Sequence, residues 1–421
     1  MTHTKNRTRV SAVKTDAGFE IWHVEDYTVP VVSLEFAFQG GAAQDPGDRA
    51  GLASLMASLL DEGAGNLTSD AFQEALEEKA IELSFDVSRD RLSGSLRTLS
   101  EHADSAFELL ALAIREPRFD ADAIDRVRAQ MISGLKRDET DPGALTRNAL
   151  YRIAFAGHPY SQPVDGRIAD LQNIRRDDVA AMKKRLMGRS NLILVAVGAI
   201  SADALAKGID HAFSGLQAQP DLVSLVPTGM DGAGHVEIID LDIPQSTLYL
   251  AMPGLGRKHP DFMAAHVVNH ILGGGSFTSR MWQEVREKRG LAYSVWSTLR
   301  WSAFADLFMA GTATSNERVA ESLAVMREEI AKMAESGPTD EELEKAKAYL
   351  TGSYALQFDT SRKIADHLLM LRADGMPIDY IDRRNDEILA VTAEKARAVA
   401  ARLFGSARPL VIATGRPQGL A

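Results

Sequence analysis

The 421-residue sequence contains no cysteine. This absence excludes disulfide bonds, thiol nucleophiles and cysteine-ligated metal sites, and it suits either the cytoplasm or the periplasm. The sequence also has no apolar run long enough to cross a bilayer, so we expect a soluble protein without a membrane segment. No apolar signal-peptide stretch follows the basic first ten residues, which predicts a cytoplasmic protein, or a periplasmic one if a leader has been removed.

Blocks of basic residues are absent too. The chain has 47 Lys and Arg against 58 Asp and Glu, a net charge of −11. Because an acidic chain repels phosphate backbones, nucleic acid is not an expected partner. The sequence contains no Gly-x-Ser-x-Gly, and no Lys-Ser/Thr follows its triple glycine, so neither a nucleophile elbow nor a P-loop is predicted.

The order of predicted elements occurs twice. Residues 32–65 and residues 247–280 each read as a strand, a loop and a helix with a glycine-rich end, and the first of these helices is predicted over about residues 50–62. The offset of roughly 215 residues fits a duplicated domain. The strands come in pairs, without a helix after each one. We therefore predict an α+β fold of two similar halves, each an antiparallel sheet backed by helices. The proline- and glycine-rich stretch 217–234 is the predicted linker between residues 1–216 and residues 235–421.

One stretch, residues 269–297, combines several signals. A helix leads through Gly273–Gly275 into a second helix, which ends at Gly290 after a basic last turn. The apolar stripe of this second helix is formed by Met281, Trp282 and Val285. Alternating residues then predict a strand. Arg286 is placed in the last turns of the helix and Tyr293 on the strand. A guanidinium and a phenol brought together could hold a peptide, although a basic helix end stacked on a core tyrosine has the same pattern.

The segment LGGG…SR…EVREKRGLAYSV resembles the C-terminal half of the insulinase, pitrilysin and mitochondrial processing peptidase family, the inverted zincins. In that family the arginine and tyrosine of R-x-x-x-G-L-x-Y form the substrate-binding pair, and they match Arg286 and Tyr293. The resemblance extends from about Gly18 to Arg416 and implies a clamshell of two similar halves. Lys288 and Arg289 are expected to face solvent or a partner.

The zinc site of that family is not present in the matching positions. An inverted zincin has H-x-x-E-H on a helix, where two histidines bind zinc and the glutamate is the general base. In the matching phrase GLASLMASLLDEG, Ser54 and Ser58 stand at the histidines and Ala57 at the glutamate. Ser133 and Gly134 lie near the position of the distal ligand. A hydroxyl is a poor ligand for zinc and alanine cannot take a proton, so we expect no metal in this chain.

A second histidine pair occurs in the motif HVVNH. His266 and His270 are four residues apart on a helix, with Asn269 where a glutamate would be. One interpretation is a zinc pair, which would make the chain a self-sufficient metalloenzyme. The other is one helix face beside a chamber or core, favoured because asparagine cannot act as a general base and no third ligand is apparent.

The resemblance implies a non-catalytic subunit of a heterodimeric zinc peptidase. A partner of the same fold would carry H-x-x-E-H and supply zinc, while Arg286 and Tyr293 of this chain would bind the peptide substrate. In the absence of that partner a homodimer is conceivable. The alternative from a different class is a structural or scaffold protein of the same fold with no role in peptide cleavage.

Overall fold

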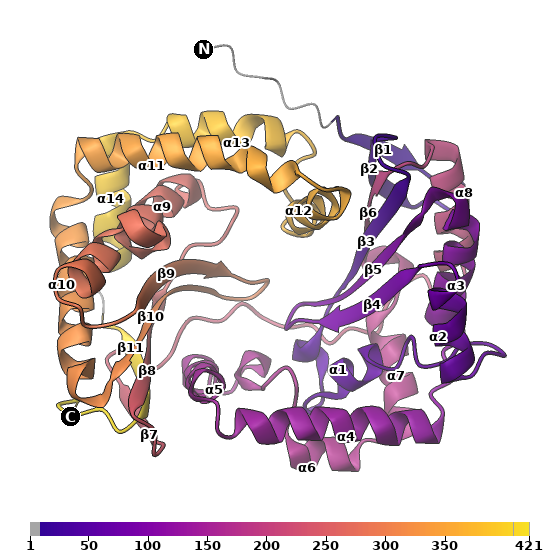
Figure 1. The fold of residues 1–421 in the computed structure, drawn as a ribbon, viewed down its shortest axis with the longest axis horizontal. Helices are drawn as coiled ribbons and strands as arrows, with labels where there is room; N and C mark the ends of the chain where they lie inside the picture. Colours follow the sequence, from indigo (N-terminus) through magenta and orange to yellow (C-terminus); the bar gives the residue numbers. More distant parts are fainter. Residues whose placement is uncertain (1–8, 407, 421) are drawn as a thin grey trace. The chain divides into compact units, whose positions relative to one another are not determined.

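The computed structural model describes residues 9–406 and 408–420, and this part of the chain forms two compact units (Figure 1). Unit 1 contains the described residues up to Leu135 together with Gln162–Ser224 and Ala355–Asp382. Unit 2 contains Lys136–Ser161, Leu225–Tyr354 and the described residues from Arg383 on. Each unit therefore combines segments that are far apart in the sequence.

The sheet of unit 1 has six strands in the order β1-β2-β6-β3-β5-β4. They are β1 (Ser11–Lys14), β2 (Glu20–Glu25), β3 (Val31–Gln39), β4 (Glu82–Val87), β5 (Arg91–Leu99) and β6 (Leu192–Gly198). Neighbouring strands are antiparallel except β2 and β6, which are parallel. Along β3, Leu34, Phe36 and Phe38 belong to the main hydrophobic core, and the residues between them point to the opposite face.

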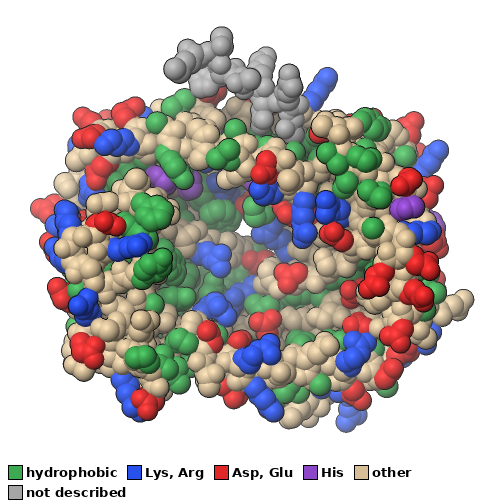
Figure 2. All heavy atoms as spheres, viewed as in Figure 1, with side chains coloured by type: hydrophobic (Ala, Val, Ile, Leu, Met, Phe, Trp, Pro, Cys, Tyr) green, Lys and Arg blue, Asp and Glu red, His purple; other side chains and the backbone are tan. Residues whose placement is uncertain are grey.

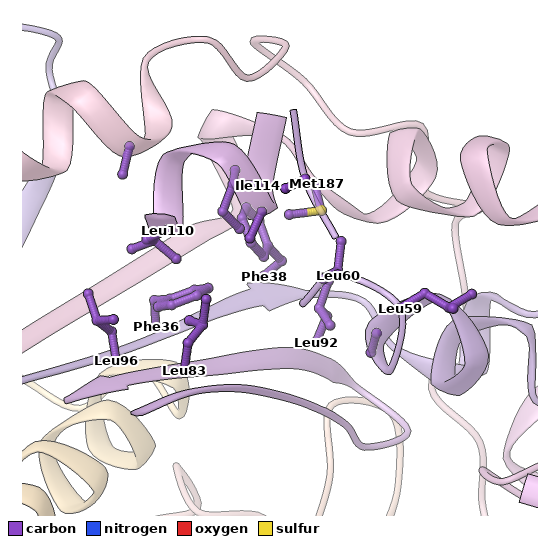
Figure 3. Close-up of a cluster of buried hydrophobic side chains, with 14 of the residues drawn as sticks. Phe36, Phe38, Leu59, Leu60, Leu83, Leu92, Leu96, Leu110, Ile114 and Met187 are labelled. Carbon is purple, nitrogen blue, oxygen red and sulfur yellow. The ribbon is translucent and has the colours of Figure 1, made fainter. Parts of the chain in front are cut away.

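Helices pack against the face that carries Leu34, Phe36 and Phe38, and against the end of the sheet, and close this core (Figure 1). They are α1 (Leu52–Ala57), α2 (Ser69–Glu77), α3 (Ala103–Arg115), α4 (Ala121–Asp138), α6 (Ile168–Asn173), α7 (Arg176–Leu186) and α8 (Ala202–Phe213). Figure 3 shows Phe36 and Phe38 among leucines of the neighbouring strands and of α3, including Leu83, Leu92, Leu96 and Leu110. The Phe36 ring lies 5.2 Å from the ring of Phe213 in an edge-on contact. Position 94 must be glycine, because a Cβ there would lie 2.1 Å from the Phe36 ring.

Unit 2 repeats this strand order. Its sheet runs β7-β11-β8-β10-β9, with β7 and β11 parallel and the other pairs antiparallel. The strands are β7 (Val236–Asp240), β8 (Gln245–Pro253), β9 (Ser294–Trp301), β10 (Asp306–Ser315) and β11 (Leu410–Gly415). The order equals β2-β6-β3-β5-β4 of unit 1 position by position. The predicted α+β fold of two similar halves is confirmed, with the refinement that each sheet contains one parallel pair.

Besides the helix over residues 361–373, the described part of the C-terminal half contains η8 (Asn316–Arg318), η9 (Ser353–Phe358) and eight further helical elements. They are α9 (Phe262–Asn269), η5 (His270–Gly274), η6 (Ser276–Thr278), η7 (Trp282–Glu287), α10 (Val319–Ser336), α11 (Asp340–Gly352), α13 (Tyr380–Leu389) and α14 (Ala393–Phe404). α9, η7, α10 and α14 contribute to the second hydrophobic core. None of the helices in the described part of the chain is both long and apolar enough to span a membrane.

Two helices are exchanged between the halves of the sequence. α5 (Pro142–Ala154) comes from the N-terminal half but packs on β8 and β11 of unit 2, where the hydroxyls of Thr146 and Thr414 form a hydrogen bond of 2.8 Å. α12 (Ser361–Ala373) comes from the C-terminal half but packs on β3 and β6 of unit 1. The two exchanged helices hold the same place in the order of elements, each following a strand pair and two long helices.

The sequence predicted a helix over residues 50–62, and the structure ends that α-helix at Ala57. The following amides of Leu59, Leu60 and Glu62 bond to carbonyls three residues back, so the chain tightens into turns before Gly63. The predicted linker, residues 217–234, forms neither helix nor strand. It is nevertheless held in place, because the Gln44 amide both donates to and accepts from the backbone of Val223, at 3.1 and 2.7 Å.

Candidate functional site

The segment from α9 to β9 carries the predicted peptide-binding pair, and two parts of it are π-helical. In η5 the amide of Gly275 donates to His270 O, and in η7 the amide of Lys288 donates to Gln283 O, each five residues back. The apolar stripe of η7 is formed by buried residues as predicted, with Trp282 and Val285 in the core of unit 2. Such wide turns are rare and occur at functional sites more often than elsewhere.

The triple glycine lets η5 lie directly against β9. A Cβ on Gly273 would come within 2.6 Å of Ser297 Oγ and 2.9 Å of Ser297 N. Buried Asn269 fixes the same contact, since Ser297 Oγ donates to Asn269 Oδ1 at 2.8 Å. Asn269 is therefore a structural residue that joins the helix to the strand.

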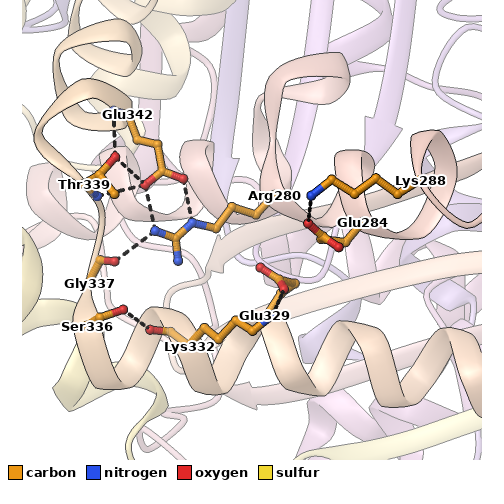
Figure 4. Close-up of polar contacts among 9 residues, drawn as sticks. All are labelled: Arg280, Glu284, Lys288, Glu329, Lys332, Ser336, Gly337, Thr339 and Glu342. Carbon is orange, nitrogen blue, oxygen red and sulfur yellow. Dashed lines mark hydrogen bonds and ion pairs between the residues drawn. The ribbon is translucent and has the colours of Figure 1, made fainter.

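The beginning of the second helix is anchored by Arg280 (Figure 4). Its Nε and one terminal nitrogen each donate to a carboxylate oxygen of Glu342 at 2.7 Å, and the guanidinium also donates to Gly337 O at 3.0 Å. Glu342 in turn accepts from the backbone and hydroxyl of Thr339, which closes the capping box of α11. The segment that carries Arg286 is thus tied to the end of α10 and the start of α11.

Arg286 and Tyr293 lie together, as the sequence predicted. The Arg286 guanidinium carbon is 4.5 Å from the centre of the Tyr293 ring and 4.3 Å from the centre of the Trp282 ring. Aromatic rings thus stack against the guanidinium, a favourable arrangement for arginine. Within residues 9–406 and 408–420, the guanidinium makes no hydrogen bond or ion pair to a protein acceptor. Its N–H groups therefore have no acceptor in that part of the chain.

The neighbouring charges are paired with one another. Lys288 and Arg289 both bind the carboxylate of Glu284, and these bonds hold the pKa of Glu284 below its usual value. Glu287 accepts from Trp282 Nε1 at 3.2 Å. The two carboxylates closest in sequence to Arg286 therefore bind other donors.

The sequence predicted Tyr293 within the strand. In the structure Tyr293 lies just before β9, which begins at Ser294. Pairing with β10 begins one residue later, at Ser294. Before that point the hydroxyl of Thr314 donates a hydrogen bond to the carbonyl of Leu291, so the backbone there does not pair with the backbone of β10. As a result the Tyr293 side chain is 81% exposed, and its hydroxyl has no partner among the described residues.

The positions that match the family's zinc ligands hold other contacts. The Ser54 hydroxyl donates to Val164 O at 2.9 Å, the Ala57 methyl group is buried in the core, and Ser58 follows the last residue of α1 on the surface. These groups do not fit a zinc ion. Across the described residues, no cluster of three or more His, Cys, Asp or Glu side chains could hold a metal.

His266 and His270 each stack on an aromatic ring. His266 lies parallel to Phe262 at 6.2 Å, and His270 stacks on Tyr349 at 5.1 Å. Burial lowers the pKa of His266 to about 3, with the nearby cations Arg384 and Arg257 contributing. Those cations oppose any added positive charge, including a metal ion, so this arrangement fits the structural interpretation better than a zinc pair.

Sequence reasoning missed the role of Trp282, which it assigned only to the apolar stripe. The spacing of Trp282 and Arg286, four residues apart on one helix face, was the available signal. It also missed Glu342, because nothing in the sequence links a residue 62 positions away to Arg280. On the face drawn in Figure 2, acidic and basic side chains are interspersed, so the overall negative charge leaves room for a local cationic site.

Comparison with known protein families gives two matches along the chain. Residues 21–166 match the family described as Insulinase (Peptidase family M16), and residues 173–350 match the Peptidase M16 inactive domain. The second match includes both Arg286 and Tyr293.

Among related proteins, the chain is 28% identical over 357 residues to the non-peptidase homolog YmxG of Helicobacter pylori, covering 85% of this chain and 82% of that protein. It is 30% identical over 293 residues to an uncharacterized zinc protease of Streptomyces coelicolor, covering 67% and 62%. The crystal structure of a peptidase M16 inactive domain from Pseudomonas fluorescens superimposes with a TM-score of 0.91 at 27% identity, covering 97% of this chain and 98% of that one.

Proposed function

Because this chain belongs to the insulinase (M16) peptidase family, we propose that it is the non-catalytic, peptide-binding subunit of a two-subunit zinc peptidase. The observation that carries the proposal is the state of Arg286. Its guanidinium is fixed by aromatic rings yet has no acceptor among the described residues. A cation held in place and left without a partner is suited to bind a ligand.

The division of labour follows from the residues present. Ser54, Ala57 and Ser58 cannot bind zinc or activate water, so the hydrolytic step would belong to a partner of the same fold that carries H-x-x-E-H. In this chain Arg286 would bind oxygen atoms of the peptide, and the exposed Tyr293 hydroxyl would form a hydrogen bond with its backbone. Both residues would position the substrate without touching the reacting water.

A scaffold role explains the fold equally well but does not explain the site. A protein that binds no peptide has no need to keep an arginine unpaired beside an 81% exposed tyrosine. The similarity to the non-peptidase homolog of Helicobacter pylori supports the absence of catalysis here and does not separate the two roles. The unpartnered Arg286 favours peptide binding.

Peptide hydrolysis in the presence of zinc tests the proposal. The chain is assayed alone, then mixed with the H-x-x-E-H protein encoded nearest to it, and co-purification shows whether the two associate or whether this chain forms a homodimer. We expect hydrolysis only by the mixture, slowed at least tenfold by Arg286→Ala and less by Tyr293→Phe. Activity of the chain alone, or unchanged activity of both variants in the mixture, would refute the proposal.

A further inference from the structure

We infer that the site at Arg286 recognises a carboxylate of the bound peptide, either an acidic side chain or a free C-terminus, and not only a backbone carbonyl. This inference rests on the proposed peptide-binding function and specifies the ligand for it. It is argued from the aromatic rings that contact the Arg286 guanidinium, from the pairing of the nearby carboxylates and from the exposed apolar ring beside them.

The aromatic contacts restrict how a ligand can approach. Trp282 and Tyr293 stack against the guanidinium, at 4.3 and 4.5 Å from its carbon to the ring centres. The N–H groups of a guanidinium point outward in its plane, so a hydrogen-bond acceptor approaches Arg286 along that plane. A carboxylate in that plane accepts two parallel hydrogen bonds, whereas a carbonyl offers a single oxygen.

The protein keeps its own carboxylates away from this edge. Glu284 is shared by Lys288 and Arg289, and Glu287 accepts from the Trp282 indole. Arg280, the other arginine of the segment, is bound to Glu342. Every other charged side chain on residues 280–293 thus has a partner, and the Arg286 charge stays unneutralised in a chain of net charge −11.

A further cation strengthens the positive field at this end of the helix. Arg318 Nη1 donates to Gly290 O at 2.6 Å, directly after the last turn of the segment. Lys288 and Arg289 are balanced by Glu284 and by the nearby Glu328 and Glu329, so the excess positive charge at this helix end is that of Arg286 itself. A neutral carbonyl ligand would leave this excess charge in place, and an anionic ligand would offset it.

An apolar ring also lies next to the stack. The Phe277 ring is 4.7 Å from the Trp282 ring in an edge-on contact and is 67% exposed. It is held outward by a fixed loop, in which Gln283 Nε2 donates to Phe277 O at 2.7 Å and Ser279 Oγ donates to Ser276 O at 2.8 Å. The site therefore matches a peptide with an apolar side chain close to its carboxylate.

Matched peptides test the inference with the purified full-length chain. The probes are one fluorescein-labelled peptide, Ala-Ala-Leu-Ala-Ala-Phe, as the free acid and as the C-terminal amide, and a second amidated pair that differs only by an internal Glu or Gln beside the Phe. Dissociation constants are measured by fluorescence anisotropy at low and high salt. We expect the peptide with the carboxylate to bind about tenfold more tightly than the matched neutral peptide. The ratio of the two dissociation constants should fall as salt screens the charge.

Four variants assign the effect. Arg286→Met should abolish the preference for the carboxylate, and Arg286→Lys should keep part of it, because a lysine retains the charge without the planar pair of donors. Tyr293→Phe should weaken both forms equally. Lys288→Met, which removes a nearby cation already bound to Glu284, should leave the preference unchanged.

The outcomes separate this inference from the function on which it rests. Equal binding of acid and amide forms, both weakened by Arg286→Met, would leave peptide binding intact and overturn the carboxylate preference. A preference that persists in Arg286→Met would also overturn it, because the carboxylate would then bind elsewhere. Binding of no probe by the folded wild-type chain, with or without the catalytic partner, would refute both.

Discussion

The Arg280 guanidinium and the Glu342 carboxylate form a two-bonded ion pair, with both N···O distances at 2.7 Å. Arg280 opens the helix that leads to Arg286, and Glu342 closes the capping box of α11. The pair is half-buried, so solvent screens it less than a surface pair. It connects the position of Arg286 to the helix that follows α10.

Arg280→Gln is expected to destabilise the protein by about 2 kcal/mol, because Glu342 loses a charge-assisted partner while Gly337 O loses its donor. Peptide binding should weaken as well, since the segment holding Arg286 loses its anchor. The measurements are urea unfolding and the KM of the assembled peptidase, which should rise more than kcat falls. Glu342→Gln should add little to Arg280→Gln, because one interaction is removed by either change.

A matched control for Arg280→Gln is an exposed ion pair on α11, the helix that carries Glu342. Lys345 and Glu341 form a pair of which both side chains are 76% exposed. Lys345→Gln should change stability by less than about 0.5 kcal/mol and leave KM unchanged. A loss from Lys345→Gln as large as that from Arg280→Gln would show that the anchoring role of Arg280 is misassigned.

Glu35, on the face of the unit 1 sheet that α12 covers, should make stability depend on pH. Burial raises the pKa of Glu35 from 4.5 to about 7, a hydrogen bond from Ser95 and the charge of Arg362 oppose the rise, and Asp366 adds to it. Since the folded state binds the proton more tightly than the unfolded chain, this contribution is complete below about pH 4.5 and is lost as the pH rises through about 7.

Glu35→Gln keeps the acceptor for Ser95 and removes the titration. The variant should match the wild type near pH 4.5 and exceed its unfolding free energy by about 3 kcal/mol at pH 8, from 1.36 kcal/mol per pKa unit. Urea unfolding at a series of pH values checks this. Glu74→Gln, at an exposed position on α2, serves as the control; parallel pH profiles for all three proteins would contradict the role of Glu35.

Gly273→Ala should raise the dissociation constant for peptides, with a smaller change in the free energy of unfolding than in the free energy of binding. The new methyl group would lie 2.6 Å from Ser297 Oγ and 2.9 Å from Ser297 N, so η5 must move away from β9. The movement displaces the start of the segment that holds Trp282 and Arg286. Anisotropy titrations with the peptides above measure the effect, and we expect a loss of about tenfold.

Gly352→Ala is the companion variant for this test. A Cβ at Gly352 meets no atom within 4 Å, and its backbone has no positive φ. It should leave binding unchanged and can raise stability slightly at the end of α11. If Gly273→Ala bound peptide as well as Gly352→Ala does, the close contact of η5 with β9 would have no bearing on the site.

Several features were accessible to sequence reasoning because they depend on local pattern. The alternating residues of β3 and the pairing of strands without a helix after each one predict an α+β fold, and the repeated order predicts its duplication. The proximity of Arg286 and Tyr293 follows from the short stretch of chain between them. Tyr293 itself was placed one residue too far into the strand, because hydroxyl groups of β10 replace part of the ladder there.

Other features could not be predicted because they depend on which surfaces meet. An apolar helix face such as that of α12 has the same pattern whether it covers the sheet of its own half or that of the other. The π-helical turns share the apolar spacing of an α-helix, so Trp282 was assigned to the core alone. The pairing of Arg280 with Glu342 joins residues that no periodicity relates.

The exchange of α5 and α12 affects how the nascent chain folds during synthesis. The sheet of unit 1 is complete once Gly198 has been made, but the helix that covers one of its faces begins only at Ser361. At 5–20 residues per second, roughly ten to thirty seconds of synthesis separate the two. During that interval α12 is absent from the nascent chain, so the face of the sheet that carries Glu35 stays uncovered. Folding of the N-terminal half is therefore completed only after most of the C-terminal half has been synthesised.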